Sequence, residues 1–270
     1  MNRPAVTLGV SLKMYFGYQR TLQWCAAVAE QIKQHPQVRS GAIEVLVIPS
    51  FPMLAPALEI FHGIAKVGAQ DVFWEDEGAY TGEVSPAVLK EMGCSLVEIG
   101  HAERRRYFAE TSRSIADKTA AAWRNGLTPM LCLGEEHHGR VEEAVEVCLE
   151  QLEASLASAV DAGLQGDLIL AYEPQWAIGA SQPASLAYIG EVCAALGKRV
   201  AENGLAGTRV IYGGSAGPGL LTALGGKVDG LFLGRFAHDP LNFASILEEA
   251  ARQCADTVIA KEEGNVWQSA

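Results

Sequence analysis

Two residues able to take part in proton transfer stand directly after short apolar segments of the sequence. Glu173 follows the apolar run Ile169 to Tyr172, and a carboxyl at the mouth of an apolar cavity loses hydration, which raises its pKa towards that of a useful base. His101 stands where a helix could begin at Ala102 or Glu103. A helix N-terminus favours the neutral imidazole, which can donate a hydrogen bond to a substrate oxygen.

Lys13 also follows an apolar segment, where an ammonium group is costly unless it faces a wet cleft or an anion. Each of the three residues has an ordinary alternative when it is taken singly. Glu173 could be an exposed carboxylate paired with a basic side chain, His101 could be bonded to the backbone, and Lys13 could be solvated. If the three converge, one site holds a carboxylate, an imidazole and an ammonium group.

Two glycine-containing turns could bind a phosphate group. The segment Gly213 to Gly219 can present several backbone N–H groups to an anion, and a helix beginning near Pro218 would add its dipole. A glycine-rich turn alone is more often only a turn. Here Gly234 and Arg235 follow the next apolar segment, and turns at two successive strand ends form the phosphate site of many α/β barrels.

The segment after Glu173 has the composition of a loop that covers a site. Pro174 stiffens the turn, and Gln175 to Ser181 is mostly apolar and ends in small residues. Such a segment suits a hinged lid that excludes water from the reaction.

Short apolar segments rich in β-forming residues must position these groups. Most are continuous runs without polar alternation, which is typical of parallel strands covered on both faces. Helical patterns lie between them, the clearest having apolar residues three and four apart from Val141 to Leu156. The eight predicted strands are Ala5 to Leu12, Ile43 to Ile48, Gly63 to Gly68, Leu96 to Ile99, Thr128 to Leu133, Leu168 to Tyr172, Arg209 to Tyr212 and Gly230 to Leu233.

This alternation predicts a single-domain (β/α)8 barrel, in which the active site lies where the strands end. The rival is an open doubly wound sheet, which is disfavoured because no Gly-x-Gly-x-x-Gly turn follows the first strand. We expect the barrel to occupy residues 1–253. Residues 254–270 have weaker periodicity and are expected to form a C-terminal extension.

Composition excludes several classes of protein. A net charge of −11 disfavours partners such as nucleic acid and anionic membranes, and no run approaches the roughly 18 apolar residues of a membrane span. The six cysteines are scattered and no export signal follows Met1, so we expect a cytoplasmic protein with reduced thiols. Glu135 to His138 is interpreted as a solvated loop, because four adjacent residues cannot all point at one metal ion.

The segment Ala171 to Gly179, Ala-Tyr-Glu-Pro-Gln-Trp-Ala-Ile-Gly, is similar to the active-site signature of triosephosphate isomerases. Other segments fall in the order of that family, so the resemblance covers nearly the whole chain. These segments are Lys13-Met14, Gly78 to Ser85, Gly100 to Arg105, Cys132 to Glu135, Tyr212 to Ser215 and Asp229-Gly230.

The resemblance implies an isomerase that works through an enediolate without metal or organic cofactor. Glu173 would be the catalytic base, His101 the neutral electrophile and Lys13 the stabilising cation. A glutamate base beside a neutral histidine is a known property of the family. Glu103 would support the site near Lys13. The phosphate would be held by Gly179, Ser215 and Gly234.

The resemblance also implies a lid and a subunit contact. Trp176 to Ser181 would close over the site, and Glu135 would meet the closed lid at Trp176. Thr81 would reach into the partner subunit of a homodimer.

Three departures from the family pattern bear on the substrate. Ser11 stands where an Asn normally contacts substrate, Ala102 replaces a Ser beside the histidine, and Arg235 replaces the second Gly of the phosphate turn. The intact core residues favour dihydroxyacetone phosphate and glyceraldehyde 3-phosphate, the substrates of glycolysis and gluconeogenesis. The room beside Ser11 and Ala102 suggests an alternative, interconversion of L-erythrulose 1-phosphate and D-erythrulose 4-phosphate. A further alternative is a barrel that binds a sugar phosphate without converting it.

Overall fold

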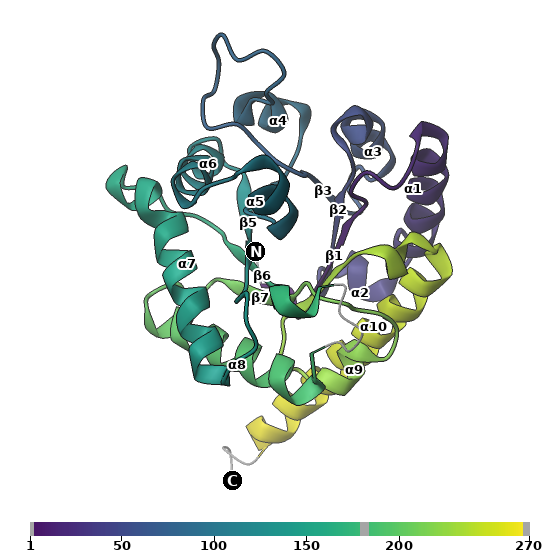
Figure 1. Ribbon diagram of the computed structural model, residues 1–270. Helices are drawn as coiled ribbons and strands as arrows, with labels where there is room; N and C mark the ends of the chain where they lie inside the picture. Colours follow the sequence, from purple (N-terminus) through teal and green to yellow (C-terminus); the bar gives the residue numbers. More distant parts are fainter. Residues whose placement is uncertain (1–2, 179–183, 267–270) are drawn as a thin grey trace.

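The computed structural model describes residues 3–178 and 184–266, which fold as a closed barrel of eight parallel strands (Figure 1). Each strand pairs with its neighbours in chain order, and β8 pairs with β1 to close the sheet. The strands are β1 (Val6–Ser11), β2 (Ile43–Ile48), β3 (Lys66–Ala69), β4 (Leu96–Ile99), β5 (Thr128–Leu133), β6 (Ile169–Tyr172), β7 (Arg209–Tyr212) and β8 (Gly230–Leu233). The barrel prediction is confirmed, and closure of the sheet excludes the open doubly wound alternative.

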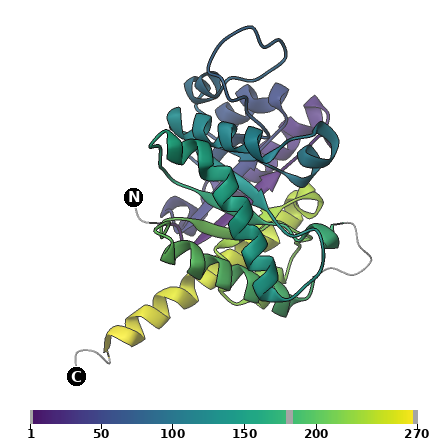
Figure 2. The same ribbon diagram turned by 60° about the vertical axis from the view of Figure 1, so that its left-hand side comes forward.

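Helices lie around the outside of the barrel (Figures 1 and 2). They are α1 (Tyr18–Ile32), α2 (Pro36–Arg39), α3 (Leu54–Ile60), α4 (Pro86–Met92), α5 (Ala102–Phe108), α6 (Ser112–Arg124), α7 (Val141–Asp161), α8 (Leu186–Glu202), α9 (Leu220–Leu224) and α10 (Pro240–Val266), with short 3-10 helices η1 (Phe51–Met53), η2 (Gln175–Ala177) and η3 (Arg235–His238). In α7 the predicted stripe packs inward, since Val145, Cys148 and Leu152 are buried. Helix α10 crosses the predicted boundary at residue 254, and its end projects from the barrel (Figure 2).

Alternate strand residues divide the core into two layers. Leu46 and Ile48 of β2 belong to the cluster inside the barrel, whereas Val45 and Val47 pack in the larger cluster that includes the helices. Leu96 of β4 is also in the inner cluster. Because side chains two residues apart on a strand share a face, the residue at position 98 also points into the barrel, close to the end where the strands finish.

Two elements begin two or more residues later than the sequence predicts. The third strand is Lys66–Ala69 and not Gly63 to Gly68, because Ile64 and Ala65 donate their backbone N–H groups to Phe61 and so continue the turn that ends α3. The helix expected near Pro218 begins at Leu220. Within residues 3–178 and 184–266, no helix is both long and apolar enough to cross a membrane.

Candidate active site

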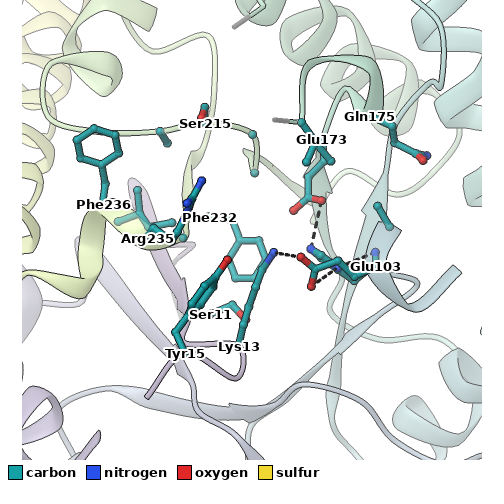
Figure 3. A pocket seen from close by; sticks show the side chains of 18 of the residues that line it. Ser11, Lys13, Tyr15, Glu103, Glu173, Gln175, Ser215, Phe232, Arg235 and Phe236 are labelled. Atoms are coloured by element: carbon teal, nitrogen blue, oxygen red, sulfur yellow. Dashed lines mark hydrogen bonds and ion pairs between the residues drawn. The ribbon is translucent and has the colours of Figure 1, made fainter. Parts of the chain in front are cut away.

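A cavity of about 660 Å³ opens where the strands end, a size suited to a small metabolite (Figure 3). It brings together the predicted proton-transfer residues with their neighbours, namely Ser11, Lys13, His101, Glu103 and Glu173. The turns after β7 and β8 line it as well, with Ser215, Gly234 and Arg235. Gly179 lies outside the described residues.

Glu173 follows β6 and is 5% exposed. Burial, and next the negative charge of Glu98, raise the pKa of its carboxyl to about 8. Two glycines allow this placement: a Cβ on Gly213 would stand 2.8 Å from Cγ of Glu173, and a Cβ on Gly134 would stand 1.9 Å from its carbonyl oxygen. The carboxyl therefore has the environment and the pKa of a general base.

His101 is the N-cap of α5, and its Nδ1 accepts a hydrogen bond from the backbone N–H of Glu103 at 3.1 Å. The proton of the neutral ring is thereby assigned to Nε2, which lies 3.5 Å from Oε2 of Glu173. Burial, and next the positive charge of Lys13, lower the pKa of His101 to about 4. The ring is thus neutral at pH 7 and presents an N–H beside the base.

Lys13 has a φ of 45°, a conformation uncommon for a side-chain-bearing residue. Its Nζ lies 2.7 Å from Oε1 of Glu103 (Figure 3), and its carbonyl accepts from Nε2 of Gln70. Burial alone would lower the pKa of Lys13, but the hydrogen bond and the nearby carboxylates outweigh it, so the pKa is raised. The cavity therefore holds a permanent positive charge close to Glu173.

The turns after β7 and β8, which are predicted to bind phosphate, lie across the cavity from the predicted base. Figure 3 shows Ser215, Arg235 and Phe236 on one side and Glu103 and Glu173 on the other. Ser215 and Arg235 are both exposed, so a ligand can reach them from solvent. The guanidinium of Arg235 offers five N–H donors, a complement for an anionic oxygen group.

Glu135 is buried and not part of a solvated loop, so that interpretation is wrong for this residue. Its Oε1 accepts hydrogen bonds from Tyr172 at 3.1 Å, from Trp176 at 2.7 Å and from Tyr188 at 3.0 Å. Three donors on Oε1 compensate for part of the lost hydration of the carboxyl, whereas Oε2 is buried without a hydrogen-bond partner. Glu135 thus contacts Trp176, at the start of the segment predicted as a lid.

Glu98 was not predicted from the sequence; it is 3% exposed and contacts residues that line the cavity. Its Oε2 accepts a hydrogen bond from Oγ of Ser11 at 3.2 Å, and its Oε1 lies 4.0 Å from Nε2 of His101. Burial raises the pKa of Glu98 to about 8. A signal was available, because Glu98 is the one charged residue inside the apolar run Leu96 to Ile99.

Comparison with known proteins shows which family shares these features. The family described as triosephosphate isomerase matches residues 6–250. The chain belongs to the triosephosphate isomerase family. A relative from Pectobacterium atrosepticum, named L-erythrulose-1-phosphate isomerase, is 58% identical over 93% of this chain and 97% of its own.

Further relatives carry one of two names, L-erythrulose-1-phosphate isomerase or triosephosphate isomerase. A protein from Rhizobium etli, also named L-erythrulose-1-phosphate isomerase, is 39% identical over 90% of this chain and 91% of its own. One from Moorella thermoacetica, named triosephosphate isomerase, is 40% identical over 78% of this chain and 88% of its own. The crystal structure of triosephosphate isomerase from Bartonella henselae matches with a TM-score of 0.75 and 30% identity, covering 92% of this chain and 99% of that one. The chain is therefore an isomerase of this family, and the non-catalytic alternative finds no support.

Proposed function

We propose that this isomerase interconverts L-erythrulose 1-phosphate and D-erythrulose 4-phosphate. The observation that carries the proposal is the 58% identity to the Pectobacterium atrosepticum protein of that name, over 97% of that protein's length. The cavity is consistent with it, since Ser11 and Ala102 both line it with short side chains.

The proposed reaction moves one proton between neighbouring carbons. Glu173 takes the proton from C3 of L-erythrulose 1-phosphate, beside the carbonyl at C2, and the enediolate places negative charge on the two oxygens. The Nε2–H of His101 and the ammonium of Lys13 stabilise that charge. Glu173 then returns the proton to C2, while the hydroxyl proton on O3 passes to O2 by way of the adjacent His101. O2 becomes a hydroxyl and the carbonyl stands at C3 of the substrate numbering. The pKa of about 8 for Glu173 suits a base that must both accept and release a proton near neutral pH.

The proposed phosphate site comprises Gly179, Ser215, Gly234 and Arg235. The guanidinium of Arg235 contributes a positive charge, which a dianion needs in a chain whose net charge is −11. Binding energy from the phosphate holds the reacting carbons against Glu173 and keeps the enediolate from losing the phosphate group.

Side-by-side turnover assays test the proposal. We expect kcat/KM for L-erythrulose 1-phosphate to exceed that for dihydroxyacetone phosphate by at least tenfold, and Glu173→Gln to abolish both activities. Glu150→Gln, an exposed change on α7, is the matched control and should leave both unchanged. Faster turnover of dihydroxyacetone phosphate would refute the four-carbon assignment.

The second candidate reaction is interconversion of dihydroxyacetone phosphate and glyceraldehyde 3-phosphate, in glycolysis and gluconeogenesis. It is favoured by the relative from Moorella thermoacetica, which is named triosephosphate isomerase, and by the intact trio Glu173, His101 and Lys13. The same assays decide between the two substrates.

We also propose that the enzyme is a cytoplasmic homodimer with the Thr81 loop at the interface. Thr81 and Tyr80 are exposed on the segment between β3 and α4, which stands away from the barrel (Figure 1). All six cysteines are free thiols, as suits a reducing compartment. Light scattering should give twice the mass of the 28.8 kDa chain, and Thr81→Arg should shift it towards the monomer; a monomeric wild type would refute the dimer.

A further inference from the structure

The proposed proton transfer leaves Glu98 without a role. This glutamate occupies β4, inside the barrel, where apolar residues such as Leu96 form the inner cluster. Burying a carboxyl there is costly unless its oxygens are hydrogen-bonded. A carboxyl whose burial lowers stability, and which lies beside a candidate active site, points to a functional role. The contacts of Glu98 indicate what that role is.

Glu98 contacts Ser11. The two residues lie on β4 and β1, which are not neighbours in the barrel, so the 3.2 Å hydrogen bond from Oγ of Ser11 to Oε2 of Glu98 crosses the interior. Ser11 lines the cavity. Because its hydroxyl hydrogen is directed to Glu98, the lone pairs of Oγ are left to accept a hydrogen bond from a ligand.

Ser11 ends β1, which pairs with β8 and so brings Ser11 next to the turn at Gly234. Its hydroxyl points across the barrel to Glu98, which lies 4.0 Å from Nε2 of His101, so the pair reaches from that turn to the proton-transfer residues.

Figure 3 shows Ser11 beside Lys13, at the opposite end of the cavity from Ser215. A substrate with its phosphate near Ser215 and its reacting carbons at Glu173 and His101 would direct its remaining carbon away from the phosphate. Buried polar groups on that wall would be left unpaired by an apolar group and satisfied by a hydroxyl.

We propose that Ser11 and Glu98 form a hydroxyl-binding subsite for the terminal hydroxymethyl group of a four-carbon sugar phosphate, with Glu98 as the residue that positions Ser11. The inference rests on the proposed function and names the residues that select its substrate. A three-carbon substrate has no group to occupy the subsite, so it leaves Oγ of Ser11 unpaired.

The charge state of Glu98 is compatible with this role. Burial raises its pKa to about 8, although Lys13 and the hydrogen bond from Ser11 oppose the rise. At pH 7 the carboxyl is mostly protonated, so the subsite adds little negative charge beside Glu173. A glutamine at this position would match the neutral carboxyl in size and would still accept from Ser11.

The test compares the two substrates in four variants. We expect Ser11→Ala and Glu98→Met to lower the ratio of kcat/KM for L-erythrulose 1-phosphate over dihydroxyacetone phosphate by about tenfold or more. Glu98→Gln should keep the ratio within twofold of wild type. Thr7→Ala is the matched control, since Thr7 is buried at the other end of β1, and it should also keep the ratio. Equal losses on both substrates would show that the pair is only structural and would overturn the subsite.

A binding measurement separates failure of the subsite from failure of the proposed function. Erythritol 1-phosphate and glycerol 3-phosphate differ by one CHOH group, and neither can be isomerised. If the wild type turns over only the triose but binds erythritol 1-phosphate more tightly, and Ser11→Ala and Glu98→Met remove that preference, the subsite stands while the proposed substrate fails. If the wild type shows no preference, the subsite is refuted. Ser11→Ala removes only one hydroxyl, so it provides the result if Glu98→Met does not fold.

Discussion

Replacement of Glu98 by glutamine should shift the pH dependence of catalysis to lower pH. The proposed base Glu173 must be ionised, and its pKa is raised to about 8. In the wild type, kcat/KM should therefore rise with pH up to about 8. Because Glu98 also has a pKa of about 8, the acid limb reports the pair of carboxyls and is broader than a single titration.

The size of the shift follows from the geometry around His101. Its Nε2 lies 4.0 Å from Oε1 of Glu98 and 3.5 Å from Oε2 of Glu173, so those two oxygens are at most about 7.5 Å apart. Two unit charges at that separation repel by roughly 2 kcal/mol at an effective dielectric constant of about 20, which corresponds to roughly 1.5 pH units. Because Glu98 also has a pKa of about 8, it is only partly ionised where Glu173 titrates. Glu98→Gln therefore removes part of this repulsion, and the pKa of Glu173 falls by less than the full amount.

The assay is kcat/KM from pH 5.5 to 9.5 for the wild type and for Glu98→Gln, with Glu150→Gln as a surface control. We expect the variant's acid limb to move down by about one unit and to fit a single ionisation, while the control superimposes on the wild type. An unchanged limb, or one moved to higher pH, would show that the charge of Glu98 does not act on the base.

Three further outcomes are expected. Gly213→Ala should lower kcat by about 100-fold, because the new Cβ would meet Glu173 at 2.8 Å and displace its carboxyl; a normal kcat would show that Glu173 can shift without cost. In scanning calorimetry, Glu98→Gln should stabilise the fold at pH 9 more than at pH 5. The raised pKa means that the wild type loses stability as pH rises from about 4.5 to about 8, by a few kcal/mol in order of magnitude, and glutamine does not ionise; equal gains at both pH values would contradict this. Arg235→Gly should raise the substrate KM about tenfold and leave kcat nearly unchanged, as expected for loss of a charge-assisted contact; a fall in kcat with constant KM would place Arg235 in the chemical step.

The barrel could be predicted closely because its strands are covered on both faces. Continuous apolar runs give the bounds of β2, β4, β5, β7 and β8 as the structure has them. The third strand was placed too early because Ile64 and Ala65 are as apolar as strand residues, and only the tertiary turn after α3 shows that they belong to it. Composition cannot distinguish an apolar turn from an apolar strand.

The site was predictable where a polar residue follows a strand and was missed where one lies inside it. Glu173, His101 and Lys13 stand at strand ends and line the cavity as predicted. Glu98 interrupts an apolar run, but the role proposed for it depends on its hydrogen bond with Ser11, which is 87 residues away in sequence. Glu135 was misread because the donors that make its burial tolerable come from β6, η2 and α8. Contacts of this kind join residues that are far apart in sequence, so they can be identified only from the folded barrel.

The backbone at Lys13 shows a trade between folding and reactivity. A φ of 45° costs an L-residue roughly 1 kcal/mol, and glycine would relieve that cost. Glycine would also remove the ammonium that Glu103 holds at 2.7 Å. Selection for stability alone would therefore favour glycine at this position, whereas the proposed role of Lys13 in stabilising the enediolate requires its ammonium group. The backbone strain at Lys13 lowers the stability of the fold, and the rest of the barrel must be stable enough to offset it.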